Sequence, residues 1–268
     1  MASFSVVSNI AAANAQANMT ATSVNLQRTI TRLSSGFRIN QAGDDAAGLA
    51  VANTYRNTQA IMNQGIRNAN DGLSTLQIKD GAMSNISSLL DRLATLATQS
   101  ASGSSSVNRA QLDSEFQKVL TEIDREANVA GLTASSGFSV FVSHETTAAN
   151  GKVSGTIGAA DKTALSLTGI AVDTVANAET AVTAVAAAVT TLGSSQGTIG
   201  TLENALQFAI NLAQSQLVSN KAAESRIRDA NIAEESANLT RYSVLTQSGV
   251  AALAQANQQS SAVLGLLR

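Results

Sequence analysis

No proline interrupts the sequence at any of its 268 positions. A chain of this length would hold roughly 13 prolines at the average usage of about 5%. Because proline removes a helix hydrogen bond and clashes with the preceding turn, its absence leaves nothing of this kind to limit helix length. Bulky core residues are also scarce, since aromatic residues make up 3% of the chain and tryptophan is absent. The composition favours long helices that pack side by side through narrow stripes of small and aliphatic side chains.

One heptad stripe runs through residues 44–100 and predicts a single long amphipathic helix there. At 1.5 Å per residue this helix would measure roughly 85 Å, which exceeds the diameter of a small globular domain. The stripe consists of Met62, Ile66, Ala69, Leu73, Leu76, Met83, Leu90 and Ala97. Its weak points are Asp80, Ser87 and Ala94, and it is widened by Ile86, Leu89, Leu93 and Leu96.

Two further segments have helical spacing. Asn108, followed by Gln111 three positions later, is typical of a helix start, and the apolar residues after it predict a helix that ends near Gly131. Helical spacing resumes at about residue 177 and continues through Leu217. Three glycines within residues 193–200 lie between helical runs of this last segment.

The middle of the chain changes from a helical to a strand-like period. Residues 138–142, 152–157 and 165–172 are short runs rich in β-branched residues or alternating in polarity, and turn residues separate them. These runs predict the only sheet of the chain, and a small one. The expected fold is mainly α, with long antiparallel heptad helices, paired N- and C-terminal halves and a small β element at the middle of the chain.

Both ends of the chain carry weaker apolar stripes than the segments between them. Ordering a residue costs about 1–2 kcal/mol, and so little apolar surface does not offset that cost. The ends therefore form either an intramolecular coiled coil that frays, or helices that become ordered only when neighbouring copies pack on them. The candidate assembly residues on these stripes are Met19, Leu26, Ile30, Leu33, Leu239, Tyr242, Leu253, Val263, Leu264 and Leu267.

The residue inventory excludes most catalytic chemistry. Without cysteine there is no thiolate nucleophile or cysteine-type zinc site, and the single histidine, His144, cannot form a histidine pair for a metal. No nucleophile, metalloprotease or phosphate-loop motif is present. We expect no catalytic residue, no metal and no cofactor, and hence no enzyme. A net charge of −2 without basic clusters argues against nucleic-acid binding, and no apolar run or cleavable leader predicts membrane insertion or Sec export.

Two segments closely resemble bacterial flagellin, the subunit of the flagellar filament. The first is RLSSGFRINQAGDDAAGLAVAN at 32–53, and the second runs from SRIRDAN at 225–231 to VAALAQANQQSSAVLGLLR at 250–268. The resemblance covers residues 1 to about 140 and 178–268. It implies a non-enzymatic protein that assembles with copies of itself into a filament for swimming motility, in which the terminal helices line a central channel.

The resemblance also implies partners and a location. Flagellins are secreted through the flagellar type III export apparatus, held by an export chaperone, and polymerise beneath a cap, next to hook-associated proteins. The filament is extracellular. Residues 1–43 with 224–268 would form the terminal coiled-coil core domain, residues 44–131 with 177–223 a helical second domain, and residues 132–176 a short variable outer segment rich in β structure.

Host innate immune receptors are further possible partners by the same resemblance. The residues that match the segment read by the plant flagellin receptor are Arg38, Ile39, Asn40, Asp44, Asp45, Gly48 and Leu49. In the patch read by an animal Toll-like receptor, Arg92, Leu96 and Gln99 fit, but Thr95 stands where a glutamate is typical. The missing carboxylate argues against recognition by the animal receptor.

Two alternatives to a filament subunit are open. A hook–filament junction protein belongs to the same family, although the long match at the C-terminal end favours the main subunit. A trimeric coiled-coil surface adhesin would show similar heptads, but it would need a Sec signal and a membrane anchor.

Overall fold

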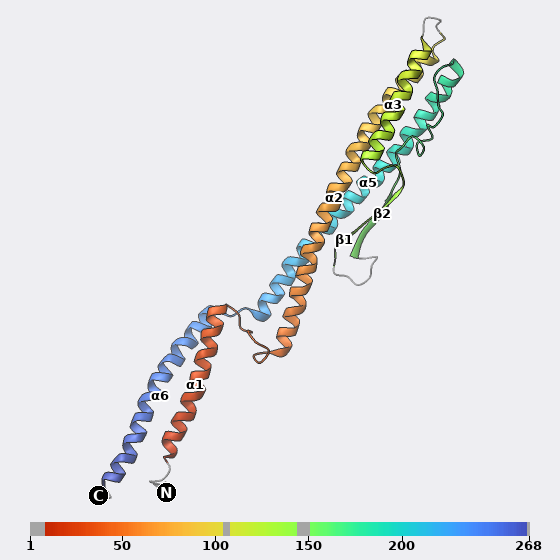
Figure 1. Cartoon of the computed structure of the whole chain (residues 1–268). Coiled ribbons are helices and arrows are strands. Elements are labelled where there is room, and N and C mark those ends of the chain that lie inside the picture. Colours follow the sequence, from red (N-terminus) through yellow and green to blue (C-terminus); the bar gives the residue numbers. More distant parts are fainter. Residues whose placement is uncertain (1–8, 104–107, 144–150, 267–268) are drawn as a thin grey trace. The chain divides into compact units, whose positions relative to one another are not determined.

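A computed structural model describes residues 9–103, 108–143 and 151–266 of the chain, except for the side chains of 259–266. The predicted turn pair at His144 lies outside the described residues. The chain divides into two compact units (Figure 1). Unit 1 comprises Met1–Asn57 and Ser219–Arg268, and unit 2 comprises Thr58–Val218. The three-part division expected from the sequence remains a prediction.

Three helices supply the core of unit 2: α2 (Ala46–Ala101), α3 (Arg109–Val129) and α5 (Val175–Arg228). The predicted start of α3 is confirmed, because the Asn108 side chain accepts a hydrogen bond from the Gln111 amide at 3.3 Å. The heptad stripe of α2 faces inward as expected. Its residues that are at most 1% exposed are Met62, Ala69, Leu76, Met83, Leu90 and Ala97.

A hairpin of two antiparallel strands, β1 (Ser136–Phe141) and β2 (Lys152–Ile157), lies against these helices. Ser136 pairs with Ile157 and Phe141 pairs with Lys152. Glycines in α2 allow the close approach. A Cβ atom at Gly65 would lie 2.1 Å from the Val142 carbonyl oxygen, and one at Gly72 would lie 2.7 Å from a Val140 methyl group.

The Gly72→Ala variant is expected to destabilise unit 2 by about 1–3 kcal/mol, because the hairpin must shift away from α2 to admit the methyl group. Urea unfolding of the whole chain measures this change. Gly81→Ala is the matched control in the same helix, since a Cβ atom there meets nothing within 4 Å. Equal stability changes in the two variants would contradict the packing described for the hairpin.

The third predicted strand, 165–172, does not form. The backbone there bonds locally, with the Leu165 amide donating to the Asp161 carbonyl and the Leu167 amide to the Lys162 carbonyl. Helix α3 holds this segment instead of a neighbouring strand, because Asp113 accepts from the Val172 amide at 2.9 Å. The alternation in sequence reflects burial alone, as Leu165, Leu167 and Val172 are at most 2% exposed.

Helix α5 is continuous through the three glycines within residues 193–200, as the helical spacing from about residue 177 to Leu217 predicts. Its inward residues on both sides of these glycines, such as Leu192 and Ile199, are buried, so tertiary packing overrides the weak local helix propensity. Helix α5 is also the one helix in the described part of the chain that is long and apolar enough to cross a membrane by length and composition. Since its buried stripe belongs to the core of unit 2, we interpret it as a core helix.

The Gly197→Ala variant is expected to stabilise the chain by about 0.5–1 kcal/mol. Alanine loses less backbone entropy than glycine when a helix forms, and a Cβ atom at this position meets nothing within 4 Å. Thermal unfolding followed by circular dichroism measures the gain. An unchanged or lower midpoint would show that the backbone at Gly197 is not the regular helix described here.

Unit 1 is built on an antiparallel pair of helices, α1 (Ile10–Ser35) and α6 (Ile232–Leu266), which lie side by side in Figure 1. The two ends of the pair are fixed by long-range bonds. The Asn9 side chain donates to the Ala256 carbonyl at 2.9 Å, and Arg32 meets Glu235 at the opposite end. The predicted fold class is confirmed: long helices, paired chain ends and a small sheet in the middle.

Candidate functional site

The contact between α1 and α6 follows one heptad stripe on each helix. Half-buried or buried residues recur at alternating steps of four and three, as in an antiparallel coiled coil. On α1 they are Ala15, Met19, Thr22, Leu26, Thr29 and Leu33, and on α6 they are Glu235, Leu239, Tyr242, Thr246, Gly249, Leu253 and Ala256. We call these residues the terminal seam.

The terminal seam is poorly filled. Among the described residues of α1 and α6, only Thr29 and Glu235 are buried, at 4% and 7% exposure, and both are polar. Every apolar seam residue stays partly exposed. Gly249 and the threonines allow the helix backbones to approach closely, but they contribute little apolar area. The pair therefore holds its geometry with small hydrophobic stabilisation.

One end of the terminal seam carries a partly satisfied ion pair. Arg32 Nη1 lies 3.4 Å from Glu235 Oε1, and the second carboxylate oxygen, Oε2, is buried without a hydrogen-bond partner among the described residues. A buried carboxylate oxygen without a donor costs free energy. This contact sets the register of the two helices more than it stabilises them.

A short backbone clip joins the two ends of the chain beside this ion pair. Gly36 ends α1 with φ of 74°, a left-handed conformation that glycine adopts without strain. Phe37 then forms an antiparallel bridge with Asp229, in which the Arg38 amide donates to the Arg228 carbonyl at 2.6 Å. The Arg228 guanidinium lies 4.1 Å from the centre of the Phe37 ring. The clip fixes the segment between α1 and α2 onto the segment between α5 and α6.

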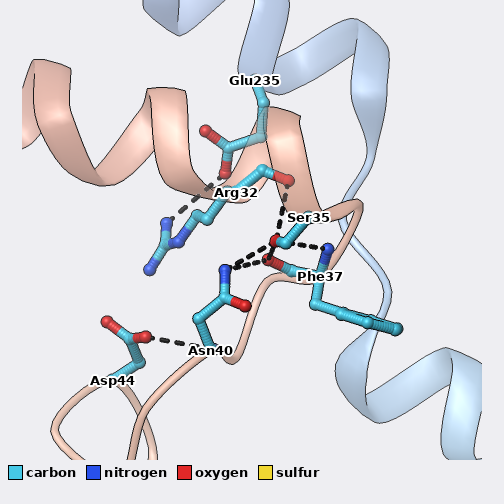
Figure 2. Close-up of polar contacts among 6 residues, drawn as sticks. All are labelled: Arg32, Ser35, Phe37, Asn40, Asp44 and Glu235. Atoms are coloured by element: carbon cyan, nitrogen blue, oxygen red, sulfur yellow. Dashed lines mark hydrogen bonds and ion pairs between the residues drawn. The ribbon is translucent and has the colours of Figure 1, made fainter.

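The loop after the clip is held by side chains, as Figure 2 shows. The Asn40 amide group donates to Ser35 Oγ at 2.7 Å, and Asp44 Oδ2 accepts from the Asn40 backbone amide at 3.2 Å. Asp45 Oδ1 then accepts from the Gly48 amide at 2.8 Å, which caps the start of α2. The two aspartates are therefore structural elements of the loop and the helix start.

The outward faces of the helix pair carry large aliphatic side chains. In the described part of α1 and α6 these side chains are 47–66% exposed. The exposed residues are Ile10, Val24, Ile30, Ile232, Val244, Leu245 and Val250. Only Ile30 among them was expected from the sequence. Unpaired apolar faces on two adjacent helices are typical of surfaces that bind another protein.

Comparison with known proteins identifies the family. Residues 6–141 match the bacterial flagellin N-terminal helical region, and residues 182–267 match the bacterial flagellin C-terminal helical region. The chain belongs to the bacterial flagellin family. It is a structural subunit of the flagellar filament and not an enzyme, and it assembles with copies of itself.

Relatives of known name match over nearly the whole chain. The flagellin of Halalkalibacterium halodurans is 35% identical, and the alignment covers 97% of this chain and 98% of that protein. Flagellin FlaB1 of Treponema pallidum is 30% identical with the same two coverages. The crystal structure of Bacillus cereus flagellin is 27% identical, with 55% of this chain and 88% of that chain covered at a TM-score of 0.47.

The candidate assembly residues fall into three groups. Leu239, Tyr242 and Leu253 of α6, like Met19, Leu26 and Leu33 of α1, lie on the terminal seam and contact the other end of the same chain, whereas Ile30 points outward. Val263 and Leu264 lie in α6 without described side chains, and Leu267 lies outside the described residues. Their role in assembly remains a prediction.

The segment that resembles the plant receptor epitope is mostly engaged within unit 1. Ile39 is 1% exposed, and Arg38 donates to the Ile227 carbonyl at 2.8 Å. Leu49 is half-buried, and a Cβ atom at Gly48 would lie 2.9 Å from a carbon of the Ile39 side chain. Asn40 and Asp44 line a groove of about 410 Å³ beside α1. Of this segment, Ile39 is therefore closed to a receptor in the described conformation, whereas Arg38 is exposed.

The animal-receptor residues do not form one surface patch. Leu96 is 1% exposed and belongs to the core of unit 2, because it lies on the inward stripe of α2. Arg92 and Gln99 are exposed, and Arg92 donates to Glu115 of α3 at 3.0 Å. Leu96 therefore belongs to the apolar stripe of α2 in the described conformation, and the expectation of poor animal recognition stays a prediction.

Proposed function

We propose that unit 1 is the assembly core of the filament subunit and that α1 and α6 become stably ordered only when copies of the chain pack on their outward faces. The observation that carries this proposal is the contrast in burial. Of the buried hydrophobic residues in the described part of the chain, only Ile39 and Ala52 belong to unit 1. All the others lie in unit 2.

The energetics of the helix pair support coupled ordering. Helix α1 comprises 26 residues and α6 comprises 35. Ordering each of these residues costs about 1–2 kcal/mol of backbone entropy. Helical hydrogen bonds and a half-exposed seam offset only part of this cost. Packing the exposed aliphatic side chains against other copies supplies about 25 cal/mol for each Å² of apolar surface removed from water. Folding of the ends and polymerisation are then one coupled equilibrium.

The finer biological setting belongs to the same proposal. We infer an extracellular filament, secreted through the flagellar export apparatus, with an export chaperone, the cap and the hook-associated proteins as partners. Weakly ordered ends suit this route, since a chain that must be exported unfolded benefits from termini that resist folding before assembly. Recognition by host innate immune receptors is a further possible interaction.

The alternatives are a hook–filament junction protein and a surface adhesin. The names flagellin and flagellar filament core protein among the full-length relatives favour the main filament subunit over both.

Salting out the purified chain with ammonium sulfate, followed by electron microscopy, tests the proposed function. We expect long filaments of uniform diameter that seed further growth from fresh monomer. Amorphous precipitate, or short capped oligomers that never elongate, would contradict a filament subunit and favour a junction protein.

A further inference from the structure

Unit 2 has an exposed apolar ridge on α5, formed by Phe208 and Leu212, and a groove beside it. Phe208 and Leu212 are one turn apart on α5 and are 74% and 59% exposed. Beside them, a groove of about 290 Å³ lies between α5 and the hairpin end, lined by Val142, Val153 and Ala213 among others. Exposed phenylalanine next to an apolar groove is a common feature of protein interaction sites.

The rim of this groove is positively charged. Lys152 lines the groove and is exposed. A partner that fits this site offers an apolar side chain to the groove and a carboxylate to the lysine. Such a partner matches both the hydrophobic and the electrostatic character of the site.

A second surface of unit 2 offers an exposed apolar side chain and a carboxylate, which complement the groove and Lys152. Ile78 of α2 is 67% exposed, and Asp71, seven residues earlier, lies on the same helix face and is also exposed. Ile78 is two residues beyond the buried Leu76, about 200° around the helix, so this face points away from the core. The hairpin contacts α2 at Gly72, the residue after Asp71.

We propose that the groove of one copy, with its Phe208–Leu212 ridge and Lys152 rim, binds the Asp71–Ile78 face of α2 from a second copy. A filament that grows by repeated addition needs two different, complementary surfaces on each subunit, because a self-complementary patch closes into a dimer. The ridge and groove on one side and the Asp71–Ile78 face on the other supply such a pair. This inference rests on the chain being a filament subunit.

Cysteine cross-linking tests the contact directly, since the natural chain contains no cysteine. Monomers with Leu212→Cys and monomers with Ile78→Cys are mixed, assembled and oxidised under mild conditions. We expect a disulfide-linked dimer in the mixture and none in filaments of either variant alone. Wild-type-like filaments without the mixed dimer would overturn this contact but leave the filament function intact, whereas wild-type chains that never form filaments would contradict the function itself.

Substitution gives a second, independent test. Leu212→Asp is expected to raise the critical concentration for assembly at least about tenfold, because one leucine contact buried in the assembled state is lost. Val129→Asp is the matched control on α3, because Val129 is 76% exposed and lies on neither surface. Combining Lys152→Asp with Asp71→Lys should restore the assembly that either change alone weakens. Equal effects of Leu212→Asp and Val129→Asp, with both monomers folded by circular dichroism, would contradict the proposal.

Discussion

Deleting residues 239–268 is expected to abolish filament formation completely while unit 2 stays folded. The deletion removes α6 from the first apolar seam position, so α1 loses the partner for Met19, Leu26 and Leu33. It also removes the exposed aliphatic side chains at Val244, Leu245 and Val250. Sedimentation of salted-out protein measures the loss of polymer.

The core of unit 2 ends before the deleted segment, at Val218. Its thermal unfolding midpoint should therefore change by no more than about 2 °C, which corresponds to less than about 1 kcal/mol for a unit of this size. Filaments formed by the truncated chain would contradict the role assigned to α6. A large drop in the midpoint would show instead that the two units do not fold independently.

The Leu253→Asp variant is expected to have the second largest effect. It places a carboxylate on the terminal seam, between Gly249 and Ala256 on the same helix stripe. Burying this charge in the assembled state costs about 3 kcal/mol or more. Since 1.4 kcal/mol corresponds to a factor of ten, the critical concentration should rise at least about a hundredfold.

Leu253→Met is the matched control for this prediction. It keeps nearly the same volume and polarity, so it should cost less than about 1.5 kcal/mol and still give filaments. Pelleting assays across a range of monomer concentrations give the critical concentration of each variant. Normal assembly of Leu253→Asp would mean that the seam observed within one chain is not buried in the filament.

The long helices were predictable because apolar residues recur at helical spacing along most of their length. In α2 nine of the eleven heptad positions from Met62 to Ala97 are apolar, Asp80 and Ser87 being the exceptions, and Met62, Ala69, Leu76, Met83, Leu90 and Ala97 are buried. The sequence was misleading at residues 165–172, where alternating buried residues predicted a strand but the backbone forms turns. Leu165, Leu167 and Val172 alternate as in a strand but are buried in a segment of turns.

The candidate site was predictable only in part, for a related reason. A search for apolar periodicity finds Met19 and Leu26, but it passes over Thr22, Thr29 and Glu235, whose spacing completes the seam while their polarity hides it. The clip between Phe37 and Asp229 joins residues nearly 200 positions apart. The residue pattern around either one does not predict such a bridge. Leu96 has both an apolar stripe position and a resemblance to a receptor patch, and its burial in the core follows the stripe.

Hydrogen–deuterium exchange on dilute monomer and on filaments tests most directly whether the chain ends depend on assembly for their order. We expect amides of α1 and α6 to exchange rapidly in the monomer and at least about a hundredfold more slowly in the filament, while the core helices of unit 2 are protected in both states. Slow exchange of α1 and α6 in the dilute monomer, matching that of unit 2, would contradict coupled folding and assembly.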